Sequence, residues 1–304
     1  MSKASEIYTI VAAIKKAEET MNLRKDWTSK GEMQKRFLEN FLKVCRNDVV
    51  NEIELEVSDR AERINAFLQR KGFSIRLQPF PANTLGFASV LDLIVEWLHL
   101  GEKTIIDAKN GGRYESVRIK KEGVSFYESM VRGYRYVVAC MQTKSGDVVF
   151  ITVPKEPLEG LDLVEMADDI FRNMDVMPGM YDGIRFPMVD LDIINDIGWL
   201  KGMSTKNAGG TPAEITEVLQ QIKIKMNEKG ARFQSATAMT VTFKCVTIPQ
   251  DLIIREPFLL WVGRHKLEKP LMAAFVTEES WKNPGGLEDL VDKTGLYPIR
   301  IEGR

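Results

Sequence analysis

Residues 218–228 read VLQQIKIKMNE, and residues 258–262 read FLLWV. In the first stretch, apolar residues alternate with lysines, and this period-2 pattern is typical of a half-buried β-strand; the apolar positions are Ile222, Ile224 and Met226. Residues 229–256 between the two stretches form a connection of more than 20 residues that is rich in Ala, Ser and Thr. Because such long connections are uncommon in compact domains and are often functional, the pattern predicts a displayed loop between two strands.

Composition narrows the classes of protein. The chain has 304 residues, of which 44% are hydrophobic and 28% charged, as in an ordinary soluble globular protein. The 42 Lys and Arg residues balance the 43 Asp and Glu residues, for a net charge of −1. This balance gives no electrostatic reason to expect nucleic acid or an anionic membrane as a partner. No apolar run approaches the roughly 18 residues that a membrane-spanning helix needs.

The ends of the chain and its cysteines bear on compartment. The apolar stretch 7–13 is short for a secretory signal, so we expect a cytoplasmic protein, with secretion by a non-classical route as the alternative. The three cysteines are far apart, which suits a reducing compartment or at most one disulfide; they are Cys45, Cys140 and Cys245. Residues 301–304 (IEGR) match a protease-tag linker, which leaves a single domain over residues 1–300.

Periodicity predicts an α+β domain dominated by antiparallel sheet. Helical spacing predicts helices over 33–45, from Ser58 to Gly72, over 161–174 and over 189–200. Strands are expected over 49–57, 113–118, 134–141, 147–153, 258–262 and 270–276, with a turn at 145–147. The apolar run 85–100 fits either a buried strand or a buried helix.

No constellation of residues points to catalysis. Neither His99 nor His265 has a metal ligand at suitable spacing, and the chain lacks a P-loop, a GxSxG and a GxGxxG motif. The sequence therefore predicts a non-enzyme without cofactor or metal, and an enzyme with a site that no motif marks is a minor alternative.

The order of these segments resembles the serpin family of serine protease inhibitors. Residues 220–231 (QQIKIKMNEKGA) resemble the central sheet-A strand and the hinge that lead into the reactive-centre loop. Residues 235–238 (SATA) fall where the family carries small residues, and Pro257-Phe258 resembles the start of the first C-terminal sheet-B strand. Residues 271–284 (LMAAFVTEESWKNP) resemble the second such strand.

The resemblance continues upstream and spans about residues 33–284. Residues 37–65 resemble the family's helix, edge strand and second helix ending in Ile-Asn, 85–97 resemble the following sheet-A strand, and 134–156 resemble a strand pair. It implies a large, mostly antiparallel sheet with a second sheet and packed helices. The region before residue 33 is shorter than the family's, so several N-terminal elements are expected to be missing, as in a minimised viral-type member. Gln220 stands where the family carries a histidine beneath the loop hinge.

The resemblance also implies a function. An inhibitory serpin is cleaved in its loop, here about 229–256, and inserts the part before the cut into its sheet as a new strand. The family's loop spacing places the bait residue at Lys244, followed by Cys245, and a lysine there would attract a trypsin-like protease. The implied hinge residues are Glu228, Lys229, Gly230, Ala231 and Phe233.

Phe233, Gln220 and the short region before residue 33 oppose the inhibitory reading, whereas Lys244 and the loop length favour it. Of the residues that would face inward (Ala231, Phe233, Ser235, Thr237), Phe233 is too large, and overpacking of this kind costs roughly 1–3 kcal/mol. If Lys244 is not the bait residue, it is simply a solvated loop residue. The alternative is a serpin-derived, non-inhibitory binding or structural protein that has lost loop insertion. In either case an oligomer or a partner chain would cover sheet edges that the short N-terminal region leaves open.

Overall fold

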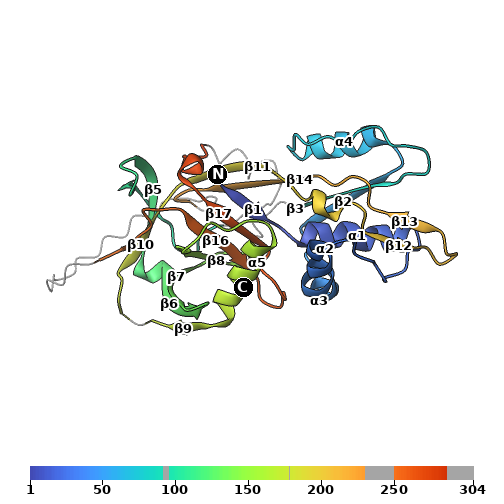
Figure 1. Ribbon diagram of the computed structural model, residues 1–304. Coiled ribbons are helices and arrows are strands. Elements are labelled where there is room, and N and C mark those ends of the chain that lie inside the picture. The colour runs from blue at the N-terminus through green and yellow to red at the C-terminus, as the bar shows by residue number, and fades with distance from the viewer. Residues whose placement is uncertain (92–95, 178, 230–249, 286–304) are drawn as a thin grey trace, which may run out of the picture.

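A computed structural model describes residues 1–91, 96–177, 179–229 and 250–285 of the chain. Its largest element is a seven-stranded sheet (Figure 1). In spatial order the strands are β1 (Lys3–Ser5), β17 (Met272–Val276), β16 (Phe258–Gly263), β8 (Val148–Thr152), β7 (Tyr134–Gln142), β6 (Val124–Val131) and β9 (Met174–Val176), and every pairing is antiparallel. The expected strands at 134–141, 147–153, 258–262 and 270–276 are thereby confirmed.

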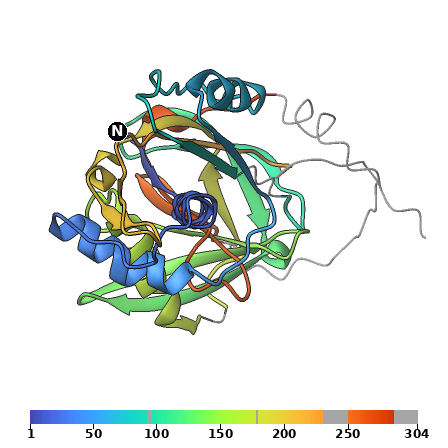
Figure 2. The same cartoon turned by 90° about the vertical axis from the view of Figure 1, so that its right-hand side faces the viewer.

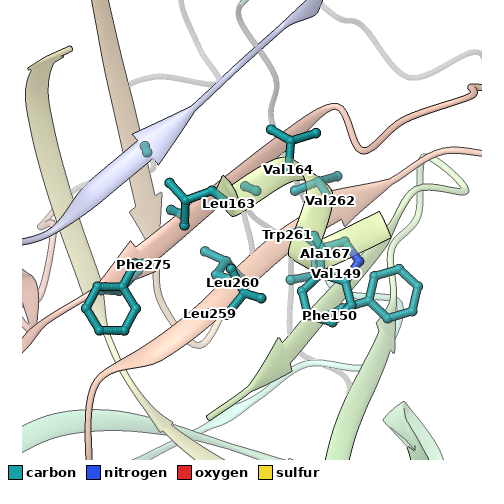
Figure 3. Packing of buried hydrophobic residues seen from close by; sticks show 14 of the residues in the cluster. Val149, Phe150, Leu163, Val164, Ala167, Leu259, Leu260, Trp261, Val262 and Phe275 are labelled. Atoms are coloured by element: carbon teal, nitrogen blue, oxygen red, sulfur yellow. The ribbon is translucent and has the colours of Figure 1, made fainter. Parts of the chain in front are cut away.

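Strand β16 reads as a continuous apolar run because both of its faces are buried. Trp261 stacks on Phe150 at 5.0 Å, and Phe150 meets Phe171 of α5 (Leu161–Arg172) edge-on. Figure 3 shows α5 packed over the sheet through Leu163, Val164 and Ala167. The alternate residues of β16 therefore point to the opposite face of the sheet.

Four smaller sheets surround this core. A four-stranded sheet has the order β15 (Leu252–Ile253), β10 (Gly183–Pro187), β5 (Arg113–Lys120) and β4 (Glu102–Asp107). The pairs are β11 (Val189–Asn195) with β14 (Gln220–Met226), β2 (Ile53–Ser58) with β3 (Gly86–Leu91), and β12 (Ser204–Lys206) with β13 (Pro212–Glu214). Short 3₁₀ turns lie at η2 (Lys121–Gly123), η3 (Gly198–Leu200) and η4 (Glu278–Ser280). An α+β fold built from sheets and a few helices is thus confirmed.

The short N-terminal region supplies two elements. β1 pairs with β17, from Lys3↔Phe275 to Ser5↔Ala273, and α1 (Tyr8–Thr20) follows it. α1 buries Ile10, Val11 and Ile14; it lies beside β3 and near α2 and β12 on one side of the molecule (Figure 1), and Figure 2 views it nearly end-on. The sequence analysis assigned no element to these residues. No helix in the described part of the chain is long and apolar enough to span a membrane.

The expected helix over 189–200 is wrong. Val189–Asn195 forms strand β11, followed by a single 3₁₀ turn. Val189 and Leu191 are buried while Asp192 is exposed, which is a strand alternation, and β11 pairs along its whole length with β14. Pairing with a strand 25 or more residues later decided the conformation that the ambiguous local pattern left open.

Other boundaries shift by a few residues. The expected strand 49–57 begins only at Ile53, and the run 85–100 contains strand β3. Residues 32–45 are helical throughout, as α2 (Glu32–Phe37), a π-helical turn η1 (Leu38–Leu42) and α3 (Lys43–Cys45). Helix α4 (Ala61–Arg70) starts after Arg60, and Ser58 caps no helical N–H, although its hydroxyl accepts a hydrogen bond from the Arg60 N–H.

One charged network joins two sheets. Arg264, directly after β16, donates to Asp147 (2.6 and 2.9 Å) in the turn before β8 and to Glu52 (both 2.8 Å) just before β2. The Asp147 side chain is only 2% exposed. Hydrogen bonds from Arg264 lower the pKa of the Glu52 carboxyl. The network therefore fixes the β2–β3 pair to the seven-stranded sheet.

We predict that Arg264→Ala lowers the free energy of unfolding by about 3–5 kcal/mol, because it leaves the Asp147 carboxylate buried without its cation. Urea unfolding at pH 7 measures the change. Arg113→Ala is the matched control, since Arg113 pairs with Asp107 at the surface (3.3 Å, both side chains more than 70% exposed) and its loss should cost about 1 kcal/mol or less. Equal losses in the two variants would show that the Arg264 network does not stabilise the fold.

Candidate functional site

Most of the predicted loop residues lie outside the described part of the chain. Glu228 and Lys229 are described and directly follow β14. The residues outside are Gly230, Ala231, Phe233, Ser235, Thr237, Lys244 and Cys245. The structure therefore defines the two ends of segment 230–249 and the surfaces around them.

The N-terminal end of the segment is held by a group of contacts that we call the hinge anchor (Trp97, Gly101, Asn227, Glu228). The buried indole of Trp97 donates to the Asn227 carbonyl (2.9 Å), and the Gly101 N–H donates to the Glu228 carbonyl (2.8 Å). The Lys229 N–H donates to the Asn227 side chain (2.9 Å). A Cβ on Gly101 would lie 3.0 Å from the Glu228 carbonyl oxygen, so glycine permits this close approach.

The Glu228 side chain is buried but incompletely paired. Its Oε1 lies 3.4 Å from Nζ of Lys103, while its Oε2 has no hydrogen-bond partner among the described residues. A buried acceptor without a donor costs free energy in the folded state. The hinge anchor therefore combines firm backbone contacts with one poorly satisfied side chain.

The C-terminal end is held by the return anchor (Asp251, Arg118, Arg185). The Asp251 carboxylate, 2% exposed, accepts from Arg118 (2.8 and 3.1 Å) and from Arg185 (2.7 Å). Burial opposes ionisation, but the hydrogen bonds from both arginines hold the pKa of the Asp251 carboxyl below its usual range. β15, which follows at once, pairs in parallel with β10.

The two anchors lie at different sheets. Asn227 and Glu228 follow β14, which pairs with β11, and the Glu228 carbonyl accepts from Gly101 directly before β4. Arg118 and Arg185 lie in β5 and β10, and Asp251 directly precedes β15. Segment 230–249 therefore leaves the described fold after the β11–β14 pair and rejoins it at the four-stranded sheet. This arrangement agrees with a connection whose ends are fixed independently of its middle.

The strand that leads into this segment has a free edge. Among the described residues, β14 pairs only with β11, and β3 pairs only with β2. Residues of β3 and of β14 line one cavity of about 810 Å³. Its other walls are α1, the segment 72–81 after α4, and inward-facing residues of the large sheet; these include Ile10, Ile14, Leu260, Val262 and Met272. The β2–β3 pair and the β11–β14 pair thus border the same cavity.

A polar cluster ties β11 and β14 to the N-terminal segment. The Gln220 Nε2 donates to the Glu6 carbonyl (2.8 Å), and the Asn195 amide donates to Gln220 Oε1 (2.9 Å) and to the Ala4 carbonyl (2.8 Å). Gln220 is buried and stands where the resemblance leads one to expect histidine. Gln220 therefore joins β14 to the residues just before the N-terminus of α1.

Residues 72–75, which we call the strap, lie against the outer face of β14. Gln221 Oε1 accepts from the Ser74 N–H (2.7 Å), the Ser74 hydroxyl (3.2 Å) and the Ile75 N–H (3.3 Å). The Lys223 ammonium donates to the Gly72 carbonyl (2.8 Å). α4 packs on β2 and β3 on the side away from α1 (Figure 1), so α4 and the strap cover the two strand pairs from outside.

Other candidate chemistry is sparse. No group of three His, Cys, Asp or Glu side chains among the described residues is arranged to hold a metal ion. Cys45 and Cys140 are free thiols, and burial raises the pKa of Cys45 to about 12 and that of Cys140 to about 11. Both are therefore unreactive protonated thiols at neutral pH.

Sequence reasoning missed several of these residues. It placed Trp97 at the end of a strand without its bond to Asn227, and it gave no role to Asn195, Asp251 or Glu6. Their partners lie far away in the chain: Asp251 meets Arg118 across 133 positions. No local pattern carries such a signal.

Neither a protein-family model nor a curated protein sequence matches the chain. Solved structures do. Serpin48 of the insect Tenebrio molitor, described as a highly specific serpin, has a TM-score of 0.56 and 13% identity over 90% of this chain and 91% of its own. A serpin of the trematode Schistosoma haematobium has a TM-score of 0.53 and 12% identity over 90% and 93%.

Thyroxine-binding globulin in complex with thyroxine is also similar, with a TM-score of 0.51 and 12% identity over 90% of this chain and 92% of that one. Three similarities that each cover nine-tenths of the chain agree with the order of motifs in the sequence. At this identity they establish architecture. The chain has the serpin fold.

Proposed function

We propose that the chain is a serpin-type protease inhibitor that inserts residues after Lys229 as a strand between β14 and β3. The observation that carries the proposal is that β14 and β3 each have an edge unpaired among the described residues and that both strands line one cavity. Strand β14 leads directly into segment 230–249. A strand edge presents a row of backbone N–H and C=O groups ready to pair with another strand. An inserted strand would satisfy both edges at once.

The dimensions suit this insertion. β14 has seven residues and β3 has six, which is a common strand length. In a strand that continues from the hinge, alternate side chains point to the same face. The side chains that would then face the cavity are those of Ala231, Phe233, Ser235 and Thr237. The cavity volume of about 810 Å³ would leave room for the Phe233 ring. The free-energy cost of overpacking expected at Phe233 would then be smaller.

Insertion also has a cost. If insertion displaces the strap from β14, it breaks the three hydrogen bonds that Gln221 accepts from Ser74 and Ile75. A typical net contribution is about 0.5–1.5 kcal/mol for each bond. The same contacts support the second candidate function, a non-inhibitory binding protein in which the strap stays on β14. The similarity to a thyroxine-binding protein of this fold is in keeping with that alternative.

The protein partner under the first proposal is a trypsin-like protease, with Lys244 as the bait residue. Such proteases recognise a basic residue before the scissile bond through an acidic specificity pocket. Cleavage after Lys244 would free the segment that starts at the hinge anchor. Its return end would stay fixed through the return anchor.

We expect trypsin to cleave after Lys244 and to form a complex with the chain that survives SDS. The cleaved chain should melt at least several degrees higher than the intact one, because each kcal/mol gained raises Tm by roughly 2–4 °C in a large domain. Lys244→Ala should abolish the complex. Arg232→Ala, which removes another trypsin-cleavable residue of the same segment, should not. Cleavage with no stable complex and an unchanged Tm would favour the non-inhibitory alternative.

The return anchor yields a pH-dependent prediction. Asp251→Asn should lower the free energy of unfolding by about 1.5–3 kcal/mol at pH 7, the usual worth of hydrogen bonds to a charged group. The folded-state pKa of Asp251 lies below the ordinary value of 3.8, so its stabilisation is present above that value and is lost as the pH falls below it. The difference between wild type and variant should therefore shrink below about pH 4.

Urea unfolding over pH 3–7 measures this difference, and amide exchange at Leu252 and Ile253 reports locally on the return end. Glu256→Gln is the matched control, because Glu256 pairs with Lys109 at the surface (2.6 Å, side chains 39% and 65% exposed). A pH-independent loss in Asp251→Asn would contradict the role of its ionised carboxylate.

A further inference from the structure

The cavity between the two strand pairs has the size of a small-molecule site. Its volume of about 810 Å³ lies within the roughly 300–1,000 Å³ that such sites occupy. The lining is mainly apolar along α1, β14 and β16, where Ile10, Ile14, Ile224 and Leu260 contribute side chains. These apolar walls favour a ligand that carries a hydrocarbon chain over a wholly polar one.

Glu6 is the exception in this lining. The side chain belongs to a residue that is only 4% exposed, directly before α1. Among the described residues that line the cavity, it is the one charged residue that is buried. The others are only half-buried or exposed, and several are already paired: Lys71 with Glu54, Lys223 with Asp192 and Glu214 with Lys30.

The hydrogen bonds of Glu6 leave its charge uncompensated. Its two carboxylate oxygens accept from the Thr9 N–H (3.1 and 3.0 Å), and Oε2 also accepts from the Thr9 hydroxyl. The Tyr8 backbone N–H is a further donor to this carboxylate; all of these donors are neutral, and no lysine or arginine in the described part of the chain forms an ion pair with Glu6. A carboxylate has about four acceptor positions, so capacity remains for a further donor.

Burial has a measurable consequence for this group. Desolvation raises the pKa of the Glu6 carboxyl to about 7, although the hydrogen bonds from Thr9 oppose the shift. Near neutral pH the group is thus divided between its acid and its anion. A cation placed beside it would favour the anion, because opposite charges attract strongly in an apolar surrounding.

We propose that the cavity binds a single-chain lipophilic amine, with its alkyl chain along α1 and β16 and its ammonium group on the carboxylate of Glu6. The apolar walls take up the chain, and the ammonium supplies the donor and the charge that Thr9 does not. The inference stands apart from protease inhibition. A ligand in this position would also occupy the space that the inward side chains of an inserted strand require.

The test uses the intact chain without protease, so its failure is distinct from a failure of loop insertion. Isothermal titration at pH 8 compares dodecylamine, dodecanol and dodecanoate, each below the concentration at which it forms micelles. We expect the amine to bind at least tenfold more tightly than the alcohol, and the carboxylate to bind most weakly. Glu6→Gln should remove the preference for the amine while leaving the affinity for the alcohol within about twofold.

Glu217→Gln is the matched control, since Glu217 also lines the cavity but is only half-buried. It should leave the preference for the amine unchanged. Ala13→Phe, which places a ring in the cavity from α1, should weaken all three ligands at least tenfold. This variant keeps the proposal testable if Glu6→Gln fails to fold.

Acidification gives an independent readout. Between pH 8 and pH 6 the ionised fraction of a group with pKa about 7 falls about tenfold, and the affinity for the amine should fall with it while that for the alcohol stays constant. The other ionisable lining residues are exposed or half-buried lysines and glutamates, and no described lining residue is a histidine. Equal affinities for amine and alcohol, or binding that Ala13→Phe leaves intact, would overturn the proposal.

Discussion

Among the described residues, the backbone of β14 is paired along one edge only, and the arrangement of the molecule around it follows from that constraint. β11 satisfies one edge from Val189↔Met226 to Asn195↔Gln220, and no described strand lies along the other. Buried backbone groups need hydrogen-bond partners, so a free edge in the middle of a domain is an unusual feature. Here α4 and the strap cover it from outside, and a cavity lies beneath it.

The N-terminal segment contacts both the seven-stranded sheet and the β11–β14 pair. β1 extends the seven-stranded sheet beside β17, and the carbonyls of Ala4 and Glu6 accept the amides of Asn195 and Gln220. α1 then runs along the cavity. The neutral side chain of Gln220 makes this link, so the contact does not itself depend on pH. The ionisable group at this place is Glu6.

The contacts that flank segment 230–249 differ in kind: neutral hydrogen bonds precede it, and charge-assisted hydrogen bonds follow it. At the hinge, backbone carbonyls of Asn227 and Glu228 accept neutral N–H donors, while the Glu228 carboxylate is poorly satisfied. At the return end, two arginines hold a buried carboxylate. Charge-assisted bonds are stronger than neutral ones, so the return end is the firmer of the two. This asymmetry is in keeping with the proposed insertion after Lys229.

The sequence by itself determined the strands that alternate or that are apolar throughout, such as β14 and β16, because side-chain period and burial leave a local trace. The order of its motifs also indicated the serpin fold. Only the tertiary structure decided that 189–195 is a strand, that β3 and β14 stand apart over a cavity, and that Asp251 meets Arg118 and Arg185. The reason is physical: these features depend on pairing between residues far apart in the chain, and neither the spacing nor the composition of one segment records its distant partner.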